Sequence, residues 1–185
     1  DYTVNAAAGF PYLTGPVEYD KPVNHVMPVW DVVAALSAVQ GLMAAERRRR
    51  ETGEGGLVQL ALSDTAFATL SHLGYVAEAE INGENRPKTG NHVFGTYGQD
   101  FETADGRRVM VTAFTSRHWQ VLVEATDTAE EMRKIEEKLS IDLRREENRY
   151  AARSQITDIF REWFKRYDFA TVSSKLGEVG ACWGP

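Results

Sequence analysis

One acidic residue stands at the start of an otherwise apolar segment. Asp31 follows Pro28 by three positions, and residues 29–45 are almost all apolar or small. Because proline is favoured in the first turn of a helix, this pattern predicts a helix that begins at Pro28 and is buried on most of its faces. The backbone N–H groups and the dipole at that end favour an ionised carboxylate, so we expect Asp31 to be charged at neutral pH. Asp31 could equally serve only as a helix cap, and the pattern leaves both roles open.

Two other groups of residues are candidates for ligand contacts. The run Arg47–Arg50 ends the predicted helix, where cations suit the dipole, but an arginine fork also matches phosphate oxygens. Gly90, Gly95 and Gly98 lack the spacing of a phosphate loop. They fit either a flexible flap over a substrate or a plain linker.

Composition argues against several classes of function. The four histidines show no metal-ligand spacing, so we expect no metal site. A net charge of −6 disfavours nucleic-acid binding. No apolar run approaches the roughly 20 residues that span a bilayer, so we expect no membrane partner. The single cysteine, Cys182, fits a cytoplasmic protein.

The predicted elements form two units. In the first, up to about residue 80, the helix after Pro28 is followed by a short buried strand at residues 57–62 and by a helix that Ser63 or Asp64 caps. Residues 81–100 are rich in glycine and asparagine and form a connector. The second unit, residues 101–185, begins with a hairpin of strands 101–103 and 109–114 and continues as helices, one of them from about residue 145 to 167. This alternation is typical of an α/β layered protein.

Several stretches, in order along nearly the whole chain, together resemble the class III CoA-transferase family, which includes formyl-CoA transferase, carnitine CoA-transferase and α-methylacyl-CoA racemase. They are residues 1–15 (DYTVNAAAGFPYLTG), Trp30-Asp31, residues 50–55 (RETGEG) with residues 58–64, residues 97–119 (YGQDFETADGRRVMVTAFTSRHW), residues 153–164 and residues 180–185.

The resemblance implies a fold and an assembly. Residues 1–80 would be part of a Rossmann-like large domain, residues 81–100 a glycine-rich flap, and residues 101–185 a small α+β domain. The large domain of the family is built from both ends of a chain about twice as long, and two chains form an interlocked homodimer. We therefore expect this chain to be a middle piece, folded but inactive alone.

The resemblance also assigns roles to residues. Asp31 would be the catalytic aspartate, which attacks an acyl-CoA thioester and passes through a mixed anhydride and an aspartyl-CoA thioester to a carboxylic acid acceptor. The flap residues Gly90, Asn91, Gly95 and Gly98 would cover the anhydride, and Arg47 is a candidate for a coenzyme A phosphate. Coenzyme A thioester would be a substrate, and no cofactor would be bound permanently.

Three alternatives remain open. The run 24–31 resembles that of a family member that moves coenzyme A between the two carboxylates of one C5 diacid, in which case Asn24 and His25 would contact the free carboxylate. A racemase of the same family would use the aspartate and a histidine for acid/base transfer of the α-proton. In a non-catalytic binding domain, Asp31 would only cap its helix.

Overall fold

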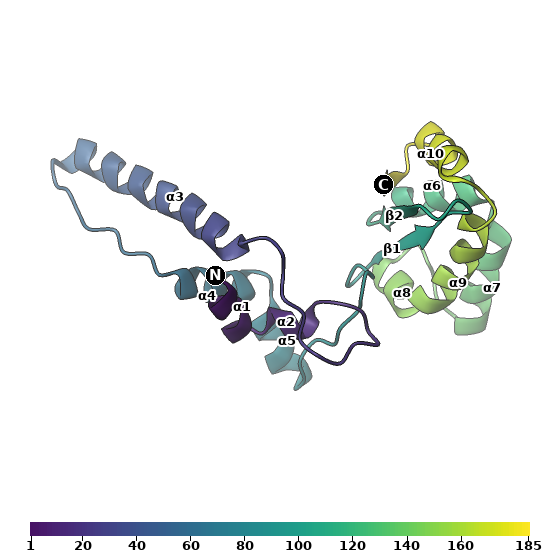
Figure 1. Cartoon of the computed structure of the whole chain (residues 1–185), viewed down its shortest axis with the longest axis horizontal. Helices are drawn as coiled ribbons and strands as arrows, with labels where there is room; N and C mark the ends of the chain where they lie inside the picture. The colour runs from purple at the N-terminus through teal and green to yellow at the C-terminus, as the bar shows by residue number, and fades with distance from the viewer. The chain divides into compact units, whose positions relative to one another are not determined.

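The computed structural model describes all residues 1–185 as two compact units, Asp1–Gly90 and Asn91–Pro185 (Figure 1). The division falls inside the segment 81–100 that the sequence assigns to a connector. The two ends of that segment belong to regular structure, since helix α5 ends at Asn82 and strand β1 begins at Tyr97.

The first unit is entirely helical. Its helices are α1 (Tyr2–Ala7), α2 (Phe10–Leu13), α3 (Val29–Thr52), α4 (Leu62–His72) and α5 (Tyr75–Asn82). The predicted buried strand at residues 57–62 is wrong. Residues 54–61 form an extended return segment without regular structure, and the side chain of Leu57 is 84% exposed. A strand needs a partner for its backbone N–H and C=O groups, and no other strand lies in this unit.

The long helix α3 begins where Pro28 predicts, but it is not buried. Trp30 is its one buried residue, and large apolar side chains lie exposed along its length: Val32, Leu36, Val39, Leu42 and Met43. Within the unit, α3 packs against α4, and Figure 1 shows the return segment running back from its far end. The prediction of burial therefore fails within this chain, because few residues of the unit face the helix.

By length and composition, α3 could cross a membrane. It has 24 residues, and its most apolar stretch has a mean hydropathy of 1.3. This corrects the sequence-based expectation that no apolar run is long enough. Small and polar residues such as Ser37, Gln40 and Gly41 interrupt the run without lowering its mean hydropathy far.

The second unit contains an antiparallel sheet of β1 (Tyr97–Glu102), β2 (Arg108–Ala113) and β3 (Cys182–Gly184), in the order β1-β2-β3. The predicted hairpin is confirmed, although its first strand starts four residues earlier than predicted. Five helices follow the hairpin in sequence: α6 (Ser116–Thr126), α7 (Ala129–Leu139), α8 (Glu146–Ala151), α9 (Arg153–Phe164) and α10 (Phe169–Glu178). The predicted helix 145–167 is thus two helices, separated at Ala152.

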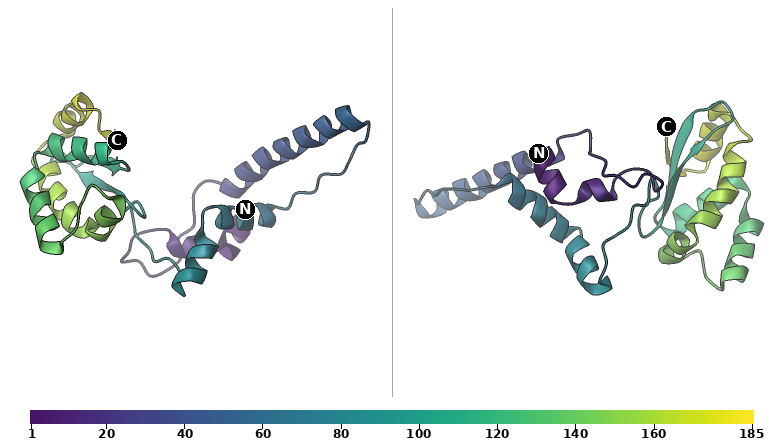
Figure 2. Two further views of the ribbon diagram at one scale, coloured as in Figure 1. Left: turned by 180° about the vertical axis from the view of Figure 1, so that it is seen from behind. Right: turned by 60° about the horizontal axis from the view of Figure 1, so that its bottom comes forward.

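The core of the second unit lies between the sheet and its helices (Figure 2). The alternating residues Val109, Val111 and Ala113 of β2 are fully buried, and α6 packs on this strand while α9 packs on β1. Aromatic side chains join the layers. The ring centroid of Phe160 lies 5.6 Å from that of Tyr97, and the Phe101 and Phe164 rings stack at 4.5 Å.

Candidate active site at the start of helix α3

Asp31 is the third residue of α3, in the turn where backbone N–H groups lack partners inside a helix. Pro28 before the helix has no N–H, and the three such groups of residues 29–31 are all satisfied. Val29 N donates to the Met27 carbonyl at 2.7 Å, and Val32 N makes the first hydrogen bond inside the helix, to the Pro28 carbonyl at 3.2 Å. The N–H groups of Trp30 and Asp31 both donate to Oδ2 of Asp1, at 2.6 and 3.1 Å.

The side chain of Asp31 is therefore not the helix cap. It makes no capping hydrogen bond, and residue 31 is exposed. No hydrogen bond or ion pair inside the chain holds its carboxylate. The capping hydrogen bonds expected of Asp31 come instead from Asp1, 30 positions away, while Asp31 remains an acid in the first turn of the helix. The Asp31 carboxylate remains available to a ligand.

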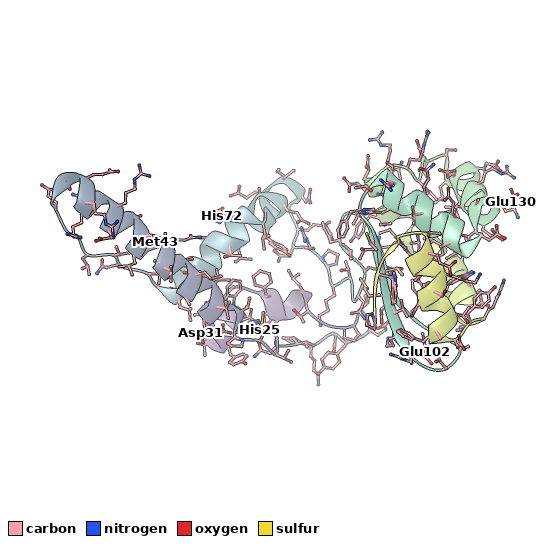
Figure 3. All side chains as sticks on the ribbon, turned by 90° about the horizontal axis from the view of Figure 1, so that it is seen from above. His25, Asp31, Met43, His72, Glu102 and Glu130 are labelled. Carbon is pink, nitrogen blue, oxygen red and sulfur yellow. The ribbon has the colours of Figure 1, made fainter.

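Asp1 is held from its other side by a histidine. The Asp1 side chain is 3% exposed, and its Oδ1 lies 2.8 Å from Nε2 of His25. The His25 ring also meets the Tyr2 ring edge-on, with centroids 5.5 Å apart. Figure 3 shows the labelled His25 and Asp31 next to each other at the start of α3. His25, a candidate from the sequence, thus lies near Asp31, because its ring and the backbone N–H of Asp31 contact the same Asp1 carboxylate.

A second polar pair fixes the indole of Trp30. Asn5 is buried, and its Oδ1 accepts a hydrogen bond from Nε1 of Trp30 at 3.1 Å. Its Nδ2 donates to Oδ1 of Asn24 at 2.9 Å, and that oxygen also accepts the N–H of His25 at 3.0 Å. The ring centroid of Phe10 lies 5.3 Å from that of Trp30. Trp30 therefore anchors the start of α3 to α1 and α2, and Asn5 links this anchor to the loop before the helix.

Sequence reasoning missed Asp1 and Asn5 as site residues. Asp1 is the N-cap residue of α1 and Asn5 lies four residues later, so both side chains are on the same face of this helix. This spacing is the only sign in the local sequence that the two residues act together. Nothing in a local pattern shows that this face meets the start of another helix.

The glycine-rich candidates belong to both units. Gly90 ends the first unit, whereas Asn91, Gly95 and Gly98 lie in the second. Gly98 is part of β1 rather than of a loop, which corrects its assignment to a flap. A Cβ on Gly98 would meet a side-chain carbon of Val93 at 2.4 Å, so close packing explains this glycine. The amide of Asn91 donates to Oδ1 of Asp100 at 2.9 Å. That the segment covers a substrate stays a prediction.

The arginine run pairs with acids of its own neighbourhood. Nε of Arg47 donates to Glu51 at 2.9 Å, and Glu46 accepts from both Arg49 and Arg50. Hydrogen bonds from Arg49 and then Arg50 hold the pKa of Glu46 below its usual value. These contacts match an ordinary solvated helix end. The Arg47 side chain is 81% exposed, and a phosphate contact there stays a prediction. No group of three or more His, Cys, Asp or Glu side chains comes together to hold a metal ion.

Known structures share this fold. A CAIB/BAIF family protein from Brucella suis superposes with a TM-score of 0.72 and 19% identity, over 100% of this chain and 47% of its own. A hypothetical protein from Mycobacterium tuberculosis superposes with a TM-score of 0.74 and 19% identity, over 99% of this chain and 46% of its own. These neighbours confirm the predicted α/β class.

Sequence comparison agrees. A 2-methylfumaryl-CoA isomerase of Chloroflexus aurantiacus is 42% identical over 185 residues, which are 100% of this chain and 45% of the relative. A succinyl-CoA:mesaconate CoA-transferase of Haloarcula hispanica is 29% identical over 98% of this chain and 43% of the relative. The chain thus spans about half the length of the curated relatives it matches. The profile of CoA-transferase family III matches residues 1–185, and the chain belongs to this family.

Proposed function

We propose that the protein to which this chain belongs transfers coenzyme A between carboxylic acids, with Asp31 as the covalent nucleophile. One observation carries the proposal: the Asp31 carboxylate stands exposed and unbonded at the start of α3, while Asp1 satisfies the helix N–H groups around it. Membership in CoA-transferase family III supports the same reaction class.

The reaction conserves the energy of the thioester. The Asp31 carboxylate attacks the thioester carbonyl, which forms a mixed anhydride and releases the coenzyme A thiolate. The thiolate attacks the Asp31 carbonyl of the anhydride, which gives an aspartyl-CoA thioester and frees the donor acid. The acceptor carboxylate then displaces the thiolate, and the thiolate attacks the acceptor carbonyl of the second anhydride. The new acyl-CoA leaves, and Asp31 is again a carboxylate.

We propose a C5 dicarboxylate as the substrate, with donor and acceptor carboxylates on one molecule. The 42% identity to a protein named 2-methylfumaryl-CoA isomerase supports this choice. Asn24 and His25 are the candidates for the second carboxylate. Nδ2 of Asn24 and Nδ1 of His25 take no part in the bonds that hold these residues, which use Oδ1 and Nε2, and Nδ1 donates to a carboxylate when both ring nitrogens carry a proton.

The rest of the protein would cover α3. Leu36, Leu42 and Met43 are each more than 60% exposed, and clusters of that kind mark surfaces that another segment or chain covers. We propose that the missing part of the protein, within an interlocked homodimer, packs on this helix and supplies most contacts to coenzyme A.

The test uses the full-length protein with a panel of acyl-CoA thioesters that includes 2-methylfumaryl-CoA. Borohydride or hydroxylamine traps an activated carboxylate, and peptide mass spectrometry locates it. We expect a modification on the peptide that contains Asp31, and its loss together with the transfer activity in Asp31→Ala. Asp64→Ala is the matched control, since Asp64 is an exposed acid in the first turn of α4.

Two results would contradict the proposal. An unmodified Asp31 together with solvent deuterium at the substrate α-carbon would identify the acid/base racemase reaction instead. Full transfer activity in Asp31→Ala would remove Asp31 from the chemistry altogether.

A further inference from the structure

We propose that Asp1 is the positioning residue of Asp31, an inference that rests on the proposed function. Its buried carboxylate binds the two free N–H groups at the start of α3, which fixes the backbone of Asp31 and leaves the Asp31 carboxylate free to react. Asp1 touches no substrate and acts through residue 31.

The contacts of Asp1 are those of a built polar centre. One oxygen, Oδ2, accepts from Trp30 N at 2.6 Å and from Asp31 N at 3.1 Å, and the other, Oδ1, faces Nε2 of His25 at 2.8 Å. Because only 3% of the Asp1 side chain is exposed, water competes little for these hydrogen bonds. Hydrogen bonds with an ionised partner are stronger than neutral ones, which suits a part that must hold geometry.

The division of labour follows from the number of donors. A first-turn aspartate ordinarily turns back onto the free N–H groups of its own helix. Asp1 already occupies the N–H groups of Trp30 and Asp31, the Met27 carbonyl occupies that of Val29, and Pro28 has none. The Asp31 carboxylate has no free N–H group to bind in its own turn. Its lone pairs point to a ligand rather than to the backbone.

The histidine side fixes how Asp1 is oriented. Oδ1 of Asp1 faces Nε2 of His25, which donates to it in the tautomer that carries its proton on Nε2. Oδ1 thus contacts His25 in the loop before α3, while Oδ2 accepts hydrogen bonds from the helix. Rotation of the Asp1 carboxylate would break both sets of bonds at once. The Trp30 indole, held by Asn5, keeps the helix start from shifting along α1.

The experiment compares Asp1→Ala and Asp1→Asn with wild type in the full-length protein, by steady-state kinetics, by trapping of the Asp31 adduct and by melting temperature. Asparagine retains an oxygen for the two N–H groups, but it loses the charge and turns an NH2 group toward Nε2 of His25, which must then accept a hydrogen bond instead of donating one. Asp20→Asn serves as the control, since Asp20 is exposed in the loop before α3 and its carboxylate forms no hydrogen bond or ion pair.

We expect Asp1→Ala to lower kcat on the order of 10²-fold, as for a reacting group misplaced by about 1 Å, with KM nearly unchanged. Asp1→Asn should recover part of this loss, retain the wild-type melting temperature and show a lower yield of trapped adduct. If Asp1→Ala does not fold, the kcat and adduct yield of Asp1→Asn decide the question.

The outcomes separate the two proposals. Wild-type kcat and adduct yield in the Asp1 variants, with Asp31→Ala inactive, would overturn the role of Asp1 and retain the function. A loss of kcat that only follows a loss of folded protein would also overturn it. Full activity of Asp31→Ala would overturn the proposed function, and the role of Asp1 with it.

Discussion

Arg149 should carry a large share of the stability of the second unit. Arg149 is 1% exposed, and its guanidinium donates to three backbone carbonyls. These are the carbonyls of Leu143 and Arg144, at 2.9 Å each, and of Phe114, at 3.0 Å. These bonds join the end of β2 to the loop between α7 and α8. Burial is the largest influence on its pKa and lowers it, while Glu146 and Glu147 act in the opposite direction. A guanidinium stays charged in proteins.

The substitution Arg149→Met keeps the apolar stem and removes the charge. Each carbonyl that loses its donor inside the protein costs about 1–3 kcal/mol. The sum is reduced because the variant no longer buries a cation, which costs several kcal/mol by itself. We expect a net loss of about 3 kcal/mol in the free energy of unfolding of this unit.

Amide hydrogen exchange with mass spectrometry measures the loss in the second unit alone. A loss of about 3 kcal/mol should raise the exchange rates of the slowest amides in β1, β2 and α9 by about 10²-fold. Arg144→Met is the matched control, because that side chain is 74% exposed and pairs only with Asp142; its rates should stay within about twofold of wild type. Rates in Arg149→Met that also stay within twofold would refute the reasoning.

Three further predictions concern separate features. Thr115→Ala should cost about 1 kcal/mol in urea unfolding of the second unit, because the Thr115 hydroxyl caps α6 by accepting from His118 N at 3.1 Å; an unchanged urea midpoint would show that water replaces the cap. Burial lowers the pKa of His92 below its ordinary 6.5, so between these two values the unfolded chain binds a proton that the folded chain does not. Stability should therefore fall as pH drops below about 6.5, and the urea midpoint at pH 5.5 relative to pH 7.5 should fall less in His92→Gln. Leu36→Glu combined with Leu42→Glu should lower the binding of a hydrophobic dye by the 185-residue chain, in which these side chains are exposed. The same pair should lower the melting temperature of the full-length protein, in which α3 is covered. A melting temperature equal to that of wild type would show that α3 stays uncovered.

The sequence predicts the second unit better than the first because that unit contains its own partners. The hairpin around Gly106 and the helices that carry Phe160 and Trp119 bury their apolar faces within residues 91–185. The strand expected at residues 57–62 and the burial expected for α3 both require neighbours that this chain does not supply. The pattern identifies these segments as apolar, but it does not show which part of the protein covers them.

The candidate site shows the same limit on a smaller scale. Pro28 and the apolar run after it place Asp31 at the start of α3 from local sequence alone. The cap comes from Asp1, 30 residues earlier, and such a contact depends on how two helices meet. The local sequence pattern therefore identifies the candidate nucleophile. Whether its carboxylate is free depends on the contact between Asp1 and the start of α3, which the local pattern does not show.

The distance along the chain between Asp1 and α3 has a consequence for how the site opens and closes. Closing a loop of this size costs on the order of 3 kcal/mol in chain entropy. Two charge-assisted hydrogen bonds contribute roughly 1.5–3 kcal/mol each, about 3–6 kcal/mol together. The cap by itself thus exceeds the loop cost by no more than about 3 kcal/mol, and the Trp30 contacts with Asn5 and Phe10 add to what holds it closed. Site opening and the loss of nucleophile alignment would then be one local event, which can occur while the remainder of α3 stays helical.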